Sequence, residues 1–373
     1  MSENVPELAI ICATSISRGL FQKHIRWRRL TDIAFQFRDI LDELRVPPNI
    51  QKIVKEAFIG VLAEVRRWDT KHSEMFVDSK KCRAMPKSDT LRTFYPHLVW
   101  KLHSLEIDDV ATCSNIMKTE CRNWPQMQFQ FACLYAETEI IFDDWKFDKY
   151  RRATFKMTLA DHPVYDFWLT LMETRREDVF FDTERRVPNQ KLTQCFAFAI
   201  RNGFRQLVEF IWSKITDRHR EAIGLLEWRA QCLRARDAHS MQFLCQNLCR
   251  MNARGCARIA WAAFFDAFHH LAHDERSDIL VPDQYRRKFE FLLRNSCPIL
   301  RQRLLKMHNY RLLCDSFRLN LSDIFSLLLF YMPSSEIAAA REFIDRIADR
   351  DPNRSNATAI LRRHMLRRQF TVD

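Results

Sequence analysis

Apolar residues recur at three- and four-residue steps along most of the chain, the period at which an α-helix buries one face. Between Phe21 and Leu44 this pattern predicts an amphipathic helix. Val46-Pro47-Pro48 ends it, because proline cannot continue the hydrogen-bond ladder. A second helix is predicted over residues 50–68. Sustained alternation of apolar and polar residues, typical of strands, is absent from the sequence, so the pattern predicts an all-α protein.

A polar stretch at residues 80–90, KKCRAMPKSDT, is the best candidate for a linker. We therefore expect an N-terminal helical region at residues 1–80, a linker at 81–90 and a string of short helices at 91–373. Ser88 or Asp89 is expected to cap the helix that begins near Leu91.

One segment, LTQCFAFAIRNGFRQLVEFIWSKI at residues 192–215, predicts two short helices joined by a tight turn at Asn202-Gly203. Weaker copies of it return along the chain, and residues 131–142 are a candidate earlier copy. The copies align on apolar positions separated by 40, 36, 46 and 35 residues: Phe167-Trp168, Leu207-Val208, Phe243-Leu244, Phe289 and Ile324-Phe325. Repetition of such a unit predicts helix pairs stacked into one elongated surface, an irregular α-solenoid.

The strongest copy resembles an ankyrin-type repeat. Over residues 195–212, the small residue Ala199, the pair Asn202-Gly203 and the pair Leu207-Val208 match the inner helix, turn and outer helix of that family. The family's Thr-Pro-Leu-His opening and its β-hairpin glycines are missing. The resemblance therefore implies ankyrin-like helix pairs, and a plain α-solenoid without projecting hairpins satisfies the same residues.

Composition narrows the classes of protein further. Five glycines in 373 residues leave no glycine-rich phosphate loop, which excludes dinucleotide-binding and P-loop folds. The longest apolar segment, residues 324–332, is too short to span a bilayer, and no secretory signal is visible. We expect the twelve cysteines to be reduced and buried, the protein to be intracellular, cytoplasmic or nuclear, and no membrane partner.

Positive charge is unevenly distributed. The net charge is +12, of which residues 1–150 carry +1 and residues 151–373 carry +11. Arginine dominates the second part and makes bidentate contacts with carboxylates and phosphates, which suggests an acidic partner; a solvated helical face is the alternative. Residues 360–370, ILRRHMLRRQF, form a basic amphipathic helix that we interpret as a terminal cap, with an import signal or acidic-surface patch as the alternative.

The densest set of potential metal ligands is Cys245, Cys249, Cys256, His269 and His273. Cys245 and Cys249, like His269 and His273, are four residues apart and could share a helix face. However, no Cys-x2-Cys knuckle occurs, so we interpret the cysteines as buried structural residues. We expect no metal and no cofactor. In each of the acidic pairs Asp108-Asp109 and Asp143-Asp144 the residues are adjacent, so their two side chains should point in different directions and have ordinary surface partners. With no nucleophile signature either, we expect no enzymatic activity.

Most of the nine tryptophans are expected to pack between helix pairs, since they fall at helical spacing among aliphatic residues; stacking platforms for nucleic-acid bases, aided by arginine, are the alternative. The sequence therefore predicts a protein-interaction module or scaffold with an acidic protein partner. The alternative is a basic helical repeat that binds nucleic acid mainly through phosphates. The residues expected to contact the partner are Arg201, Phe204, Arg205, Arg234, Arg236, His239 and Arg318.

Overall fold

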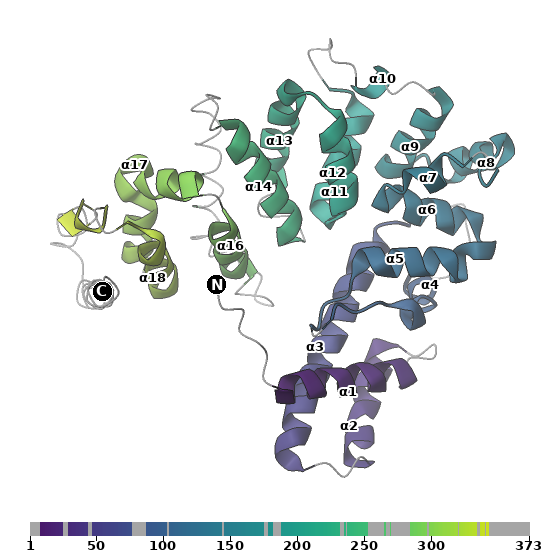
Figure 1. Cartoon of the computed structure of the whole chain (residues 1–373), viewed down its shortest axis with the longest axis horizontal. Coiled ribbons are helices and arrows are strands. Elements are labelled where there is room, and N and C mark those ends of the chain that lie inside the picture. Colours follow the sequence, from purple (N-terminus) through teal and green to yellow (C-terminus); the bar gives the residue numbers. More distant parts are fainter. Residues whose placement is uncertain are drawn as a thin grey trace. The chain divides into compact units, whose positions relative to one another are not determined.

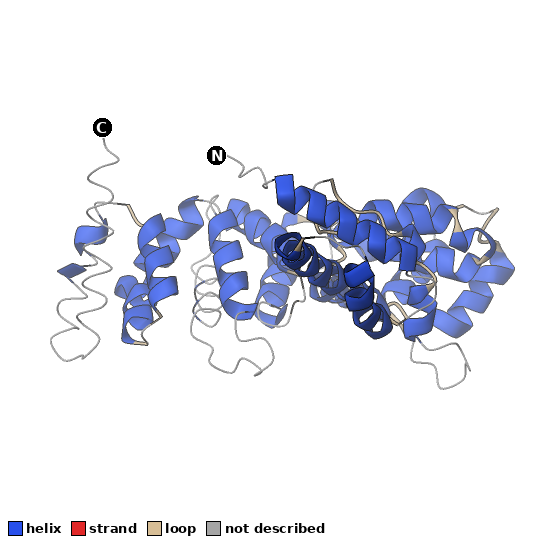
Figure 2. Cartoon of the chain, turned by 90° about the horizontal axis from the view of Figure 1, so that it is seen from below, coloured by secondary structure: helices blue, strands red, loops and turns tan. Residues whose placement is uncertain are grey.

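The computed structural model is helical in the part of the chain that it describes, apart from an antiparallel bridge between Trp100 and Ile107 (Figures 1 and 2). The all-α prediction is confirmed. The chain divides into two compact units, Met1–Glu177 and Asp178–Asp373. The described residues are 8–24, 29–43, 47–76, 87–102, 104–143, 145–174, 178–181, 188–231, 235, 237–252, 265, 269, 284–296, 298–319, 321–333, 336–339 and 341–342.

Unit 1 is built around the long helix α3, which packs against α1, α2 and α4. Pro48 is the first residue of α3, so the predicted break at Pro47-Pro48 is confirmed. Further along the unit, α6 packs against α5, α7 and α9, and α8 packs against α9. The elements of unit 1 are α1 (Leu8–His24), α2 (Leu30–Glu43), α3 (Pro48–Ser73), α4 (Lys87–Arg92), η1 (Tyr95–His97), α5 (Asp109–Lys118), η2 (Glu120–Asn123), α6 (Pro125–Tyr135), α7 (Thr138–Ile141), α8 (Lys149–Leu159) and α9 (Pro163–Thr174).

The chain directly after α3 packs into unit 1, where distant side chains satisfy its carbonyl groups. The Tyr165 hydroxyl donates to the Met75 carbonyl at 2.8 Å, and the Gln130 amide donates to the same oxygen at 3.3 Å. His162 Nε2 donates to the Glu74 carbonyl at 2.9 Å. Because a buried carbonyl without a partner is costly, these bonds tie residues before 80 to residues far beyond it.

The predicted division at 81–90 is therefore wrong as a boundary between compact units, which falls between residues 177 and 178. The predicted cap is also wrong, because α4 already begins at Lys87 and Ser88 and Asp89 lie inside it. The helix predicted from Phe21 to Leu44 corresponds to two elements, α1 ending at His24 and α2 beginning at Leu30.

Unit 2 consists of helices that pack against their neighbours along the chain and against the next pair. Within it, α11 packs against α12 and α13, α14 packs against α12, α13 and α16, and α18 packs against α16 and α17. The backbone of α17 is non-helical at residues 307–310. The described helices of unit 2 are α10 (Asp178–Phe181), α11 (Gln190–Asn202), α12 (Arg205–Lys214), α13 (Asp217–Gln231), α14 (Ala238–Asn252), α16 (Gln284–Asn295), α17 (Pro298–Arg318) and α18 (Ser322–Tyr331).

The predicted tight turn at Asn202-Gly203 is confirmed. Gly203 has a left-handed backbone with φ of 80°, and the Ala199 carbonyl accepts from both Gly203 N (3.0 Å) and Phe204 N (2.9 Å). These two hydrogen bonds end α11 at a glycine with a left-handed backbone, a common helix end, and the chain then enters α12.

The same closure occurs at two other helix pairs. The Ala132 carbonyl accepts from Glu137 N between α6 and α7, and the Ser316 carbonyl accepts from Leu321 N between α17 and α18, both at 2.9 Å. The residues that precede the second helices, Glu137, Phe204 and Leu321, have nearly the same backbone angles: φ of −74°, −83° and −85°, and ψ of 76°, 73° and 71°. One turn conformation is thus used three times.

The apolar positions that define the repeat are buried in the second helices, except Phe243, which is half-buried. Phe167-Trp168, Leu207-Val208 and Ile324-Phe325 are at most 3% exposed, as are Phe289 and Leu244. Trp168 and Trp228 are fully buried, which agrees with a packing role, whereas Trp124 is 42% and Trp145 is 97% exposed, so the packing prediction is wrong for these two. Six of the described cysteines are buried thiols, as predicted, whereas Cys12 is an exposed thiol, so the prediction of burial is wrong for Cys12. No described helix is long and apolar enough to cross a bilayer.

Candidate binding hollow on unit 1

The residues predicted to contact a partner are partly engaged within the chain. Arg201, Arg205, His239 and Arg318 are exposed, as expected. However, Arg201 Nε donates to Gln231 at 3.3 Å, Arg205 forms an ion pair with Glu209 at 2.7 Å, and Arg318 lies 3.6 Å from Asp315. The His239 ring lies edge-on to Phe291, with 4.9 Å between ring centroids.

The prediction that Phe204 contacts a partner is wrong, because its side chain is fully buried. It precedes α12 directly after the turn, and its ring stacks on that of Phe198 with 6.0 Å between centroids. A residue that closes a helical hairpin faces the interior, so it packs against the hairpin and contacts no partner. Arg234 and Arg236 lie outside the described residues, as does the predicted terminal helix at 360–370.

The candidate metal ligands have separate partners where they are described. Cys245 is buried with its Sγ 3.7 Å from Ser296 Oγ, and His269 Nε2 lies 2.9 Å from Asp315 Oδ2. The Cys249 side chain, Cys256 and His273 lie outside the description. Within the described part of the chain, no three His, Cys, Asp or Glu residues are grouped as metal ligands would be.

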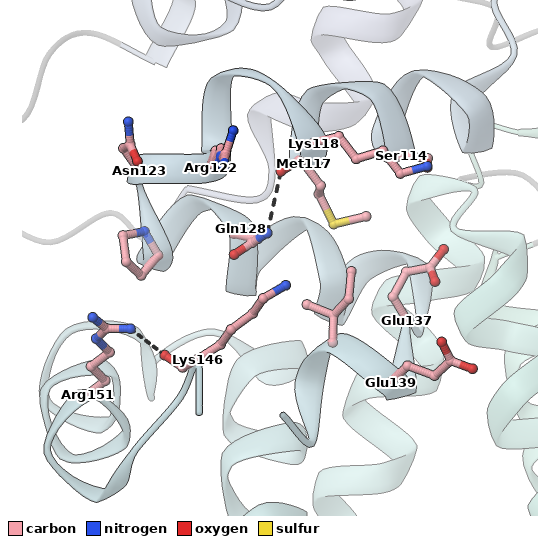
Figure 3. Close-up of a pocket in the computed structure, with 12 residues that line it drawn as sticks. Ser114, Met117, Lys118, Arg122, Asn123, Gln128, Glu137, Glu139, Lys146 and Arg151 are labelled. Atoms are coloured by element: carbon pink, nitrogen blue, oxygen red, sulfur yellow. Dashed lines mark hydrogen bonds between the residues drawn. The ribbon is translucent and has the colours of Figure 1, made fainter. Parts of the chain in front are cut away.

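A hollow of about 820 Å3 lies on unit 1 between α5, η2, α6, α7 and α8 (Figure 3). Local sequence signals place its walls. Asp108 caps α5, Pro125 opens α6, and Asp148 caps α8 by accepting from Arg151 N at 2.8 Å. The hollow is lined by Ser114, Met117, Lys118, Arg122, Asn123, Pro125, Gln128, Glu137, Glu139, Ile140, Lys146 and Arg151.

Most charges of opposite sign are separated across this hollow. Arg122, Lys146 and Arg151 lie at one side of it, and Glu137 and Glu139 lie at the other (Figure 3). The exception is Lys118, which lines the hollow from α5 with its side chain directed toward Ser114, on the side of the glutamates (Figure 3). The Arg151 guanidinium donates to the Lys146 carbonyl at 2.5 Å, which fixes the loop that enters α8. Lys118, Arg122 and Lys146 form no ion pair with any described residue. Unpaired charges at a concave surface are available to a ligand, unlike the paired arginines of unit 2.

Sequence reasoning missed this hollow because its residues come from five elements with no common spacing. Its basic residues also lie in the first 150 residues, where acidic residues elsewhere reduce the net charge to +1. The only available signal was the clustering of capping residues and prolines between residues 108 and 148, which marks closely spaced helix ends.

A second group of charges in unit 1 is fully engaged. Asp109 binds Lys71 at 2.6 Å and Arg67 at 2.7 Å, and its side chain is 16% exposed. Burial alone would raise the pKa of this carboxyl, but Lys71 and Arg67 hold the pKa well below its usual range. The side chains of Asp108 and Asp109 therefore diverge, as predicted. The prediction of ordinary surface partners is wrong for Asp109, because its carboxylate joins a half-buried network.

Buried thiols give no sign of activation. Burial raises the pKa of Cys113 and Cys195 well above the ordinary value, so both remain protonated near neutral pH. A protonated thiol is a weak nucleophile. These cysteines contribute packing.

No family model, curated protein or solved structure matches the chain. The fold and the hollow therefore define its class: an all-helical protein whose described part joins helix pairs by one repeated turn and has a charge-separated hollow on unit 1.

Proposed function

We propose that the chain is a non-enzymatic protein-interaction module whose helix pairs form an irregular, ankyrin-like α-solenoid. The repeated turn after Ala132, Ala199 and Ser316 supports this proposal, because one conformation would set consecutive pairs at similar angles. The neighbour-to-neighbour packing of α11, α13 and α14 supports it as well.

The binding site is the hollow of unit 1, and the ligand is a segment of a partner protein. The single observation that carries this proposal is the separation of unpaired charges on its two sides. Carboxylates of the partner would bind near Arg122 and Lys146, while backbone N–H groups or basic side chains would face Glu137 and Glu139.

A polyanion fits the same hollow less well. Phosphates would pair with the basic side but would be repelled by the two glutamates opposite, which have no basic partner among the described residues. A polypeptide can present both signs of charge within a few residues. Protein is therefore favoured over nucleic acid at this site.

Photo-crosslinking in the full-length protein tests this proposal. A benzophenone amino acid in place of Gln128, which lines the hollow, should crosslink a partner from native lysate, and the same label in place of Gln22 on exposed α1 should not. The adduct should resist nuclease and disappear with protease. Double charge reversal R122E/K146E should abolish it, while K52E/K55E on exposed α3 positions should not.

The results that overturn the proposal are equally specific. A nuclease-sensitive adduct would assign the hollow to nucleic acid. An adduct that forms equally from Gln22, or that survives R122E/K146E in a protein with unchanged circular dichroism, would remove the hollow as the binding site.

A further inference from the structure

Two carboxylates on one side of the hollow have no cation paired with them. Glu137 directly precedes α7, and Glu139 lies in its first turn. Both line the hollow, and neither side chain forms an ion pair or a hydrogen bond with a described residue. Helix α7 is only four residues long, so its dipole offers these carboxylates little stabilisation. Neighbouring like charges repel each other, and a bound cation would relieve that repulsion.

Lys118 does not neutralise this side of the hollow. Its side chain is directed toward Ser114, and it forms no ion pair with either glutamate or with any other described residue (Figure 3). One lysine against two glutamates leaves a net charge of −1 on this side. The glutamate side therefore still attracts a positive group of a ligand.

Apolar side chains accompany the two carboxylates. Met117 and Ile140 line the same hollow, and the Met117 thioether extends toward the side of Glu137 (Figure 3). Met117 is only 4% exposed and Ile140 is half-buried, so neighbouring residues hold both in place. Lysine and arginine side chains bury an aliphatic stem along apolar surface while their charged end binds elsewhere. A backbone N–H group has neither the stem nor a full charge, so it complements this lining less completely.

We infer that Glu137 and Glu139 form a subsite for a lysine or arginine side chain of the bound protein segment, with its stem on the apolar lining. The same segment presents an Asp or Glu to Arg122 and Lys146, so the ligand class is a segment that carries both signs of charge. This inference rests on the proposed function, because it specifies which residue of the segment occupies the acidic side of the hollow.

Selection from a phage-displayed library of random peptides on immobilised full-length protein tests the subsite. Peptides selected by the wild type should carry both an acidic and a basic residue. The charge reversal E137K/E139K should instead select peptides with Asp or Glu in place of the basic residue, because like charges then repel it. The matched control D39K/E56K makes the same change of charge at exposed positions of α2 and α3, and it should select the same peptides as the wild type.

The variant E137Q/E139Q removes the charges and keeps the side-chain shapes. It should bind the selected peptides about tenfold or more weakly by fluorescence anisotropy, with unchanged circular dichroism. Norleucine in place of a peptide lysine keeps the stem and removes the charge, so it should weaken binding to the wild type but not to this variant. No enrichment of Lys or Arg, the same selection by E137K/E139K as by the wild type, or an E137Q/E139Q affinity within about twofold of wild type would overturn the inference.

The two proposals fail separately. Selected peptides that lack a basic residue but lose their binding in R122E/K146E would remove the acidic subsite and leave the hollow as a binding site. A Gln128 adduct and selected peptides that both survive R122E/K146E, or a library that yields no binding peptide, would remove the hollow and the subsite with it.

Discussion

The Tyr135 hydroxyl donates a hydrogen bond to His72 Nε2 at 2.9 Å, joining α6 to α3 in the core of unit 1. His72 Nδ1 lies 2.8 Å from the Trp68 carbonyl, which can only accept, so Nδ1 carries the proton. The ring is thus a neutral imidazole in one tautomer. Both of its nitrogens are satisfied at a position where neither reaches water.

Tyr135→Phe should therefore destabilise the protein. The substitution leaves His72 Nε2 as a buried acceptor without its donor, and we expect a loss of about 1–3 kcal/mol in the free energy of unfolding. Urea denaturation followed by circular dichroism measures it. Tyr150→Phe is the matched control and should change nothing, because Tyr150 is 84% exposed. Equal stability of the two variants would contradict the assigned role of the Tyr135 hydroxyl.

Acidification should weaken unit 1 through His72. Burial lowers the pKa of His72 to about 3, against about 6.5 in the unfolded chain, so the folded state binds fewer protons between these values. Its contribution to stability is therefore complete above pH 6.5 and is lost as the pH falls toward 3.

The measurement compares wild type with His72→Gln. The difference in unfolding free energy between the two should shrink from pH 7 to pH 4.5. The difference is needed because Asp69 acts in the opposite direction: burial raises its pKa to about 6, so its contribution is lost as the pH rises. A constant difference across this range would show that His72 protonates normally in the folded protein.

Asp109→Ala should cost far more than removal of an exposed carboxylate. Lys71, which is only 11% exposed, would lose its ion pair with Asp109, and breaking such a largely buried pair costs about 3–5 kcal/mol. Glu106→Ala is the control, because the Lys101–Glu106 pair is exposed at both ends and should contribute less than about 1 kcal/mol. Similar urea concentrations at the unfolding midpoint of the two variants would show that the Asp109 network contributes little to stability.

The repeated turn predicts opposite effects at two equivalent positions. Ala136, four residues after Ala132, has a left-handed backbone with φ of 54°, so Ala136→Gly should stabilise by about 0.5–1 kcal/mol. Gly203, four residues after Ala199, has the same handedness, and an added Cβ would lie 2.6 Å from Asp237 Cβ. Gly203→Ala should therefore destabilise by about 1–2 kcal/mol or more.

Thermal unfolding of both variants measures these effects. Gly19→Ala is the control, since Gly19 is helical, exposed and free of close neighbours, and it should be neutral or slightly stabilising. A destabilised Ala136→Gly would contradict the equivalence of the two turns.

Local features were predictable because neighbouring residues decide them. Pro47-Pro48 fixes the start of α3 through the missing backbone donor, and Asn202-Gly203 fixes the α11–α12 turn through the left-handed backbone that glycine accepts. The burial of Leu207 and Ile324 follows from helical periodicity in the same way.

The sequence by itself therefore determined an all-helical chain, its proline break and the turn that joins its best helix pair. Only the tertiary structure decided that Phe204 is buried, that Asp109 faces Lys71, that unit 1 extends to residue 177, and that Arg122 lies across a hollow from Glu139. The physical reason is distance along the chain. Backbone and periodicity preferences act within a few residues, whereas burial, ion pairing and a concave surface depend on which distant helices pack together.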